Sequence, residues 1–117
     1  MTWARGVDSW MRLAEQFERL NMLHEAATAL AKAVAADPAN PESYHRLGIF
    51  LAAYGQTNLA IGYLEVAVRL HGDNSSARMA LATALLSLGR TQEAILQLRQ
   101  ASIRRPEDTT LALHATG

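Results

Sequence analysis

The sequence predicts an all-α protein, an α-solenoid in which helix–turn–helix hairpins stack side by side. Three observations support this fold class. Alanine and leucine dominate the composition, the sequence repeats itself every 34 residues, and each repeat contains two stretches of helical hydrophobic spacing separated by a turn signal. We therefore expect a single domain over residues 1–117, built from repeats at 7–40, 41–74 and 75–108.

Composition and charge narrow the class of protein. The chain has 22 alanines, 17 leucines and only three prolines among 117 residues, which favours helices. Its net charge is zero, so it lacks the basic surface that non-specific binding to nucleic acid or to an anionic membrane needs. We expect no nucleic-acid partner and no membrane insertion. The absence of cysteine excludes disulfides, thiol catalysis and cysteine-based zinc sites.

The 34-residue period is visible as columns of identical residues. Leucine fills two columns and alanine fills two more, in all three blocks and without a gap. The columns are Leu13, Leu47 and Leu81; Leu30, Leu64 and Leu98; Ala26, Ala60 and Ala94; and Ala33, Ala67 and Ala101. Such agreement is typical of a repeat architecture in which each block is one supersecondary unit that stacks on the next.

Each block predicts a first helix, a turn and a second helix. In the middle block, helical spacing runs from Tyr44 to Tyr54, residues 55–58 (Gly-Gln-Thr-Asn) form a turn signal, and helical spacing resumes at Ala60. The first and third blocks place Asn21 and Gly89 at the matching turn position, where a left-handed conformation ends a helix. For the helix starts we expect N-caps at Asn40, Asn74 and Asp108 (first helices) and at Thr57 and Thr91 (second helices), with Pro41 at a first helical position.

The two ends of the chain fall outside the repeats. Residues 1–6 are interpreted as a lead-in and residues 109–117 as a partial capping helix, because Ala112 falls in the column of Trp10 and Tyr44. Charged residues from Arg5 onward interrupt the N-terminal region, so we expect no signal peptide and a cytoplasmic location. Ten arginines against one lysine, in an alanine-rich chain, are typical of a GC-rich bacterial genome.

The period and its residue pattern resemble the tetratricopeptide repeat (TPR) family. In that family an aromatic residue, leucine, a small residue and a large apolar residue mark the first helix, and alanine, an aromatic or leucine, alanine and proline mark the second. The matching positions are Trp10, Leu13, Ala14, Phe17, Ala26, Leu30, Ala33 and Pro38; Tyr44, Leu47, Gly48, Leu51, Ala60, Leu64 and Ala67; and Leu81, Ala82, Leu85, Ala94, Leu98, Ala101 and Pro106. The resemblance implies a right-handed superhelix. Gly72 replaces the proline, and Arg78 replaces the aromatic, which predicts looser packing at the start of the third repeat.

Two glycines inside the predicted helices need separate explanations. Gly48 shares a column with Ala14 and Ala82, where a small residue lets two helix backbones approach closely. Gly62 has Thr28 and Leu96 as counterparts, on the outward side of the second helix. Either Gly62 is tolerated without a role, or another chain approaches the convex face there.

No pattern in the sequence predicts catalysis. Residues 24–28 (His-Glu-Ala-Ala-Thr) lack the second histidine of a zinc-protease motif, and Ala26 already belongs to a packing column. The four histidines occupy four different repeat positions, which argues against a shared metal site. Glu42 and His45 could pair as an acid and a base, yet Glu42 is also favourable as a first-turn carboxylate. We expect no enzyme activity, no cofactor and no metal.

Stacked hairpins curve, and their first helices line a concave groove. The groove runs from charged at its N-terminal end to apolar at its C-terminal end, and methionines suit a surface that adapts to a partner. The alternative is that Ile49 and Met79 belong partly to the core and that Met11 is an isolated surface residue. The candidate binding residues are Met11, Arg12, Glu15, His45, Arg46, Ile49, Met79, Thr83 and Leu86.

These residues predict a non-catalytic protein–protein interaction module that binds a peptide or helix of a partner protein in its concave groove. TPR proteins that hold the C-terminal carboxylate of a chaperone use lysines, asparagines and an arginine on this face. That set is absent here, where the corresponding places hold Met11, Glu15, Arg46, Ser76 and Ala80. Two alternatives stay open: a scaffold that self-assembles through its terminal edges, and a secretion-type chaperone or regulatory segment of a larger system.

Overall fold

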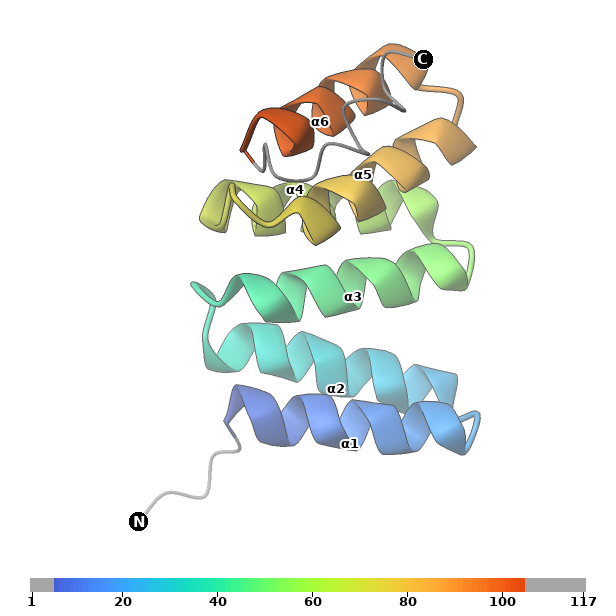
Figure 1. Ribbon diagram of the computed structural model, residues 1–117. Coiled ribbons are helices and arrows are strands. Elements are labelled where there is room, and N and C mark those ends of the chain that lie inside the picture. The colour runs from blue at the N-terminus through green and yellow to red at the C-terminus, as the bar shows by residue number, and fades with distance from the viewer. Residues whose placement is uncertain (1–5, 105–117) are drawn as a thin grey trace.

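The chain forms six helices over the residues that the structure describes. The structure is a computed structural model, and it describes residues 6–104, the side chains of 102–104 excepted. The helices are α1 (Val7–Arg19), α2 (Leu23–Ala36), α3 (Pro41–Ala53), α4 (Thr57–Leu70), α5 (Ser75–Ser87) and α6 (Thr91–Arg104), with no strand in this range. They pair as three antiparallel hairpins that stack in chain order (Figure 1). The prediction of an all-α solenoid of helical hairpins is confirmed.

The first helix of each hairpin ends in the same way. Asn21, Gly55 and Gly89 have positive φ angles of 59°, 88° and 78°. Beyond each of them, the next backbone N–H reaches back to a carbonyl in the last turn of the helix, as Gln56 does to Leu51 at 2.8 Å. Because this geometry needs a left-handed residue, glycine or asparagine is the residue that fits. The predicted turn positions are confirmed.

The helix starts agree only in part with the sequence prediction. The Asn40 side chain accepts a hydrogen bond from the backbone N–H of Glu42 at 2.9 Å, and that of Asn74 accepts one from Ala77 at 3.1 Å, so both predicted caps are confirmed. Thr57 and Thr91 were wrong predictions, because each is already the first residue of its helix. The tight turn that follows the first helix places the N-cap of the second helix one residue earlier, which is Gln56 for α4. Asp108 lies outside the described residues.

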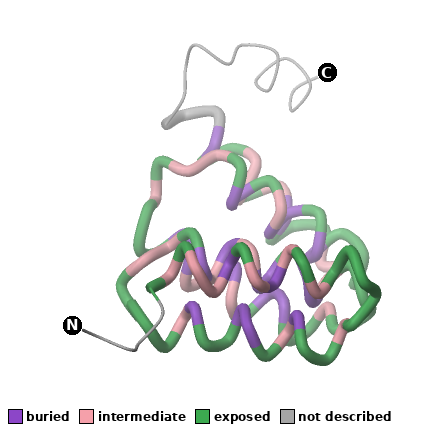
Figure 2. Tube along the Cα trace, turned by 90° about the horizontal axis from the view of Figure 1, so that it is seen from below, coloured by how far each residue is buried: buried purple, intermediate pink, exposed green. Residues whose placement is uncertain are grey.

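The hydrophobic core lies along the helix faces that meet between and within hairpins (Figure 2). The leucine and alanine columns fill it: Leu47, Leu64 and Leu81 are at most 3% exposed, and the six alanines of the two alanine columns are fully buried. Small residues let the helices approach closely while leucines fill the remaining space. At the N-terminal edge of the described stack, Leu13 and Phe17 are only half-buried.

Arg78, the main departure from the repeat pattern, is well accommodated. Its side chain is buried, its Nε donates a hydrogen bond to the carbonyl oxygen of Gly72 at 3.0 Å, and Nη1 donates one to Gln97 at 3.0 Å. In the preceding repeat, the Tyr44 hydroxyl donates to the carbonyl of Pro38 at 2.8 Å. Arginine and tyrosine therefore make the same side chain-to-backbone bond, 34 residues apart, and the arginine keeps its buried nitrogens hydrogen-bonded.

Gly62 borders a shallow apolar pocket of about 220 Å³ on the side of α4 that faces solvent, together with Tyr44, Leu59, Tyr63 and Val66. A Cβ atom added to Gly62 would meet no atom within 4 Å. Packing inside the chain therefore does not require this glycine.

Two further expectations concern the chain as a whole. Residues 1–5 of the lead-in, the partial capping helix over 109–117 and the end of the third repeat lie outside the described residues. No helix within residues 6–104 is both long enough and apolar enough to span a bilayer.

Candidate functional site: the concave face

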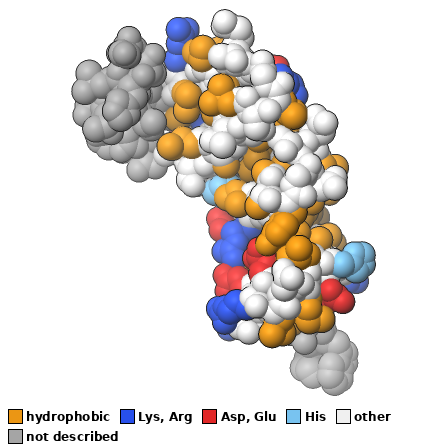
Figure 3. All heavy atoms as spheres, turned by 90° about the vertical axis from the view of Figure 1, so that its right-hand side faces the viewer, with side chains coloured by type: hydrophobic (Ala, Val, Ile, Leu, Met, Phe, Trp, Pro, Cys, Tyr) orange, Lys and Arg blue, Asp and Glu red, His pale blue; other side chains and the backbone are white. Residues whose placement is uncertain are grey.

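The stack of hairpins is curved, and helices α1, α3 and α5 lie on the inner side of the curve (Figures 1 and 3). We call the exposed surface of these three helices the concave face. Charged side chains gather on it toward the N-terminal end, and hydrophobic side chains toward the other end (Figure 3). Two pockets hollow this face, one on each side of Ile49.

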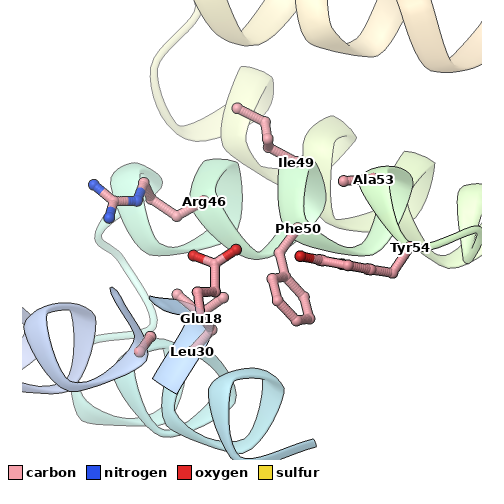
Figure 4. Close-up of a pocket in the computed structure, with 8 residues that line it drawn as sticks. Glu18, Leu30, Arg46, Ile49, Phe50, Ala53 and Tyr54 are labelled. Carbon is pink, nitrogen blue, oxygen red and sulfur yellow. The ribbon is translucent and has the colours of Figure 1, made fainter. Parts of the chain in front are cut away.

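The α1–α3 pocket has a volume of about 300 Å³. Its walls combine aromatic, aliphatic and charged side chains from α1, α2 and α3 (Figure 4). The rings of Phe50 and Tyr54 pack against each other at a centroid distance of 4.8 Å, and Tyr54 is 48% exposed. The lining residues are Ala14, Glu18, Leu30, Arg46, Ile49, Phe50, Ala53 and Tyr54.

The α3–α5 pocket, of about 290 Å³, lies on the other side of Ile49. No lining residue carries a charge, and the polar groups are hydroxyls. That of Thr83 donates a hydrogen bond to the Met79 carbonyl at 2.9 Å, inside its own helix. The pocket thus suits an apolar side chain. It is lined by Ile49, Ala52, Thr57, Leu64, Ala80, Thr83, Ala84 and Ser87.

An ion pair joins the first two hairpins across the concave face. Arg46 Nη2 lies 2.6 Å from Glu15 Oε2, and Nη1 lies 3.9 Å from Glu42 Oε2. The hydrogen bond from Arg46, more than any other effect, lowers the pKa of the Glu15 carboxyl. The guanidinium of Arg46 is therefore already compensated by two carboxylates before a partner arrives.

The structure brings together only some of the predicted binding residues. Arg46, Ile49 and Thr83 line the two pockets, and Glu15 holds Arg46 in place. Arg12 instead lies with Ser9, Leu13 and Gln16 at a separate pocket on α1.

The remaining predicted residues differ in exposure although three of them share one column. Met11 and His45 are buried, at 7% and 8% exposure, whereas Met79 is 42% exposed. The hairpins that contain Met11 and His45 are each followed by another hairpin that stacks on them, and within residues 6–104 no hairpin follows that of Met79. Leu86 is 49% exposed on α5, outside both pockets.

His45 is a buried polar group on α3. Its Nε2 has no hydrogen-bond partner among the described residues. Burial, which disfavours the charged imidazolium, lowers the pKa of His45; the Glu42 carboxylate opposes this shift and the Arg46 guanidinium adds to it. His45 therefore favours the neutral state in the folded protein.

We expect His45→Met to remove part of the acid sensitivity of the fold. Below about pH 6.5 the unfolded chain takes up a proton at this histidine more readily than the folded chain, so stability is present above that pH and is lost as the pH falls. Methionine occupies the same column in the other two repeats and leaves no unpaired nitrogen. Urea unfolding at pH 7.5 and pH 5 should show a gain of about 1 kcal/mol at pH 5, larger than at pH 7.5. His24→Met, at an exposed position, is the matched control. If His45→Met gained the same stability at both pH values, burial of His45 would not be the cause of the acid sensitivity.

The candidate list from the sequence missed Glu18, Phe50 and Tyr54 of the α1–α3 pocket. Glu18 could have been predicted from the repeat. Leu86 was on the list, and Ala52 and Glu18 occupy the same column one and two repeats earlier. Ala52 and Glu18 line the two pockets. Tyr54 could not be found in this way, since it follows the last residue of α3 and its ring turns back toward Phe50 (Figure 4).

Within residues 6–104, no group of three or more histidine, aspartate or glutamate side chains is placed to hold a metal ion.

Curved stacks of helical hairpins with pockets on the inner face are the architecture of tetratricopeptide repeat proteins. Residues 19–101 match the family described as "Anaphase-promoting complex, cyclosome, subunit 3", which is of the tetratricopeptide repeat type. The match covers more than half of the 117 residues, and the chain belongs to this family. No protein with a curated description matches the sequence.

Solved structures with the same fold include the first TPR domain of Spaghetti (RPAP3) bound to the HSP90 peptide SRMEEVD, with 16% identity, coverage of 94% of this chain and 87% of that one, and a TM-score of 0.81. The complex of a yeast Sti1 TPR domain with Hsp70 has 16% identity to this chain and a TM-score of 0.79, and the match covers 89% of this chain and 83% of that one. MamA has 22% identity to this chain and a TM-score of 0.78. That match covers 90% of this chain and 61% of MamA, so this chain spans about six-tenths of the length of that protein. At these identities the likeness concerns the fold.

Proposed function

We propose that the chain is a non-catalytic interaction module that binds a peptide or helix of a partner protein on its concave face. The observation that carries the proposal is the pair of pockets that flank Ile49, a side chain that is 45% exposed between them. Two side chains of one peptide segment could enter the two pockets while Ile49 packs between them. Structures of the same fold with bound peptides support this reading.

We expect Ile49→Glu to weaken peptide binding by at least tenfold without unfolding the protein. The probe is a library of acetylated and amidated decapeptides with every position randomised, from which binders of the wild-type chain are selected and then measured by fluorescence anisotropy. A carboxylate at position 49 would place a charge at the edge of both pockets and leave it poorly solvated once a peptide binds.

Leu96→Glu on α6 is the matched control, because Leu96 is 57% exposed and lies outside both pockets. It should bind the selected peptides as the wild type does, and both variants should keep the wild-type helical circular dichroism. Equal affinities of Ile49→Glu and wild type would refute binding on the concave face.

A second candidate function is self-assembly through the N-terminal edge. Trp10, Leu13 and Phe17 border a pocket of about 400 Å³ there, and Leu13 is half-buried where its counterpart Leu47 is 3% exposed. A second copy could cover this edge as α3 covers the preceding hairpin. Sedimentation equilibrium over a wide range of concentration separates the candidates, since a monomer at all concentrations would remove this one.

A further inference from the structure

The charges of the α1–α3 pocket are unevenly compensated. Two of its lining residues are charged, Arg46 and Glu18. Arg46 is engaged by Glu15 and Glu42, whereas the carboxylate of Glu18 forms no hydrogen bond or ion pair with any described residue. In Figure 4 the Arg46 guanidinium points away from the two aromatic rings, and the Glu18 carboxylate lies on the side that faces them. The pocket therefore offers one unneutralised negative charge to a ligand.

The position of Glu18 in its helix does not favour a carboxylate. It lies in the last turn of α1, where the backbone carbonyls carry partial negative charge and a cationic side chain is preferred. No described side chain compensates Glu18 for this repulsion. Residues that oppose local preference without a structural gain are concentrated at functional sites.

The aromatic wall of the pocket complements the same kind of ligand. The face of an aromatic ring carries negative potential and attracts ammonium and guanidinium groups. The exposed ring of Tyr54, held by Phe50, stands in the same pocket as Glu18, and Leu30 and Ala53 supply apolar surface for the methylene stem of a long side chain.

We propose that the α1–α3 pocket binds an arginine or lysine side chain of the partner, while the uncharged α3–α5 pocket binds an apolar side chain of the same segment. This inference rests on the proposed function, and it assigns the chemistry of the ligand: an internal basic–apolar segment. Charge complementarity carries it, because the cation of the α1–α3 pocket is already paired and its carboxylate is not.

The test repeats the selection of capped decapeptides on charge variants of the protein. Wild type should enrich peptides with arginine or lysine next to an apolar residue. Glu18→Lys should reverse the preference toward aspartate or glutamate, and Glu18→Gln should weaken the best basic peptide about tenfold. Replacing the basic residue of that peptide by glutamine should give a similar loss, and the two losses should not add when the changes are combined.

Glu25→Lys makes the same charge change on α2 outside both pockets of the concave face, so it is the matched control and should keep the basic preference. A melting temperature of Glu18→Lys at or above that of the wild type shows that its fold is intact. Suppose that Ile49→Glu abolishes binding. If the wild type then shows no preference for basic peptides, or if Glu18→Lys retains that preference, this inference fails and the proposed function stands. If no peptide binds, or Ile49→Glu binds as wild type does, the proposed function fails, and the inference with it.

Discussion

Leu64→Ala should lower the free energy of unfolding by about 3–4 kcal/mol, the largest effect that we expect from a single substitution in this chain. Leu64 is 0% exposed and is one of the largest fully buried side chains. It lies in one cluster with Ile61, Leu81 and Leu85, so it joins the second hairpin to the third. Other members of that cluster are alanines, which are too short to refill the space that the leucine leaves.

Urea unfolding followed by circular dichroism measures this loss against a total stability of the order of 5–15 kcal/mol for a domain of this kind. Leu59→Ala is the matched control, because the same change is made on the same helix at a side chain that is 53% exposed. It should change stability by less than about 0.5 kcal/mol. Equal losses in the two variants would mean that α4 does not pack as the structure has it.

The sequence was sufficient for the fold because its signals are local and repeated. Helical spacing and the left-handed turn residues depend only on neighbours along the chain. The 34-residue period shows the same local signals in three repeats. The helix starts at Thr57 and Thr91 were misplaced by one residue, because hydroxyl residues suit both a cap and a first turn. The backbone of the preceding turn determines that these threonines are the first residues of their helices and not their N-caps.

The site was harder to predict because exposure depends on the neighbouring hairpin. Met11 and Met79 occupy the same column, yet the first is buried and the second exposed. Arg78 shows the same limitation in the core: its guanidinium replaces an aromatic ring only because the Gly72 carbonyl and the Gln97 side chain lie within reach. The spacing of apolar residues does not reveal such polar contacts, because they depend on which side chains folding brings together.

The column of Ala14, Gly48 and Ala82 leads to the second large effect: Gly48→Ala should destabilise the fold by about 2 kcal/mol, although alanine is the better helix former. A Cβ atom on residue 48 would lie 2.6 Å from Cγ and 2.7 Å from Cδ2 of Leu64, and 3.4 Å from the carbonyl oxygen of Ala60. Leu64 is fully buried in a packed cluster, so a shift of its Cγ and Cδ2 atoms would disturb the core contacts that it makes. Gly62→Ala is the matched control: with no atom within 4 Å of the added Cβ, it should stabilise the protein by about 0.5–1 kcal/mol.

The contact between residues 48 and 64 also predicts strong non-additivity. In the background of Leu64→Ala, the Cγ and Cδ2 atoms that obstruct the new methyl group are gone, so Gly48→Ala should become neutral or stabilising. The double variant should then be more stable than the sum of the two single losses predicts, by about 2 kcal/mol in a double-mutant cycle. Additive losses would show that Gly48 is required for some reason other than the approach of Leu64. A positive coupling would instead make this pair the reason that the second repeat has glycine where the other two have alanine.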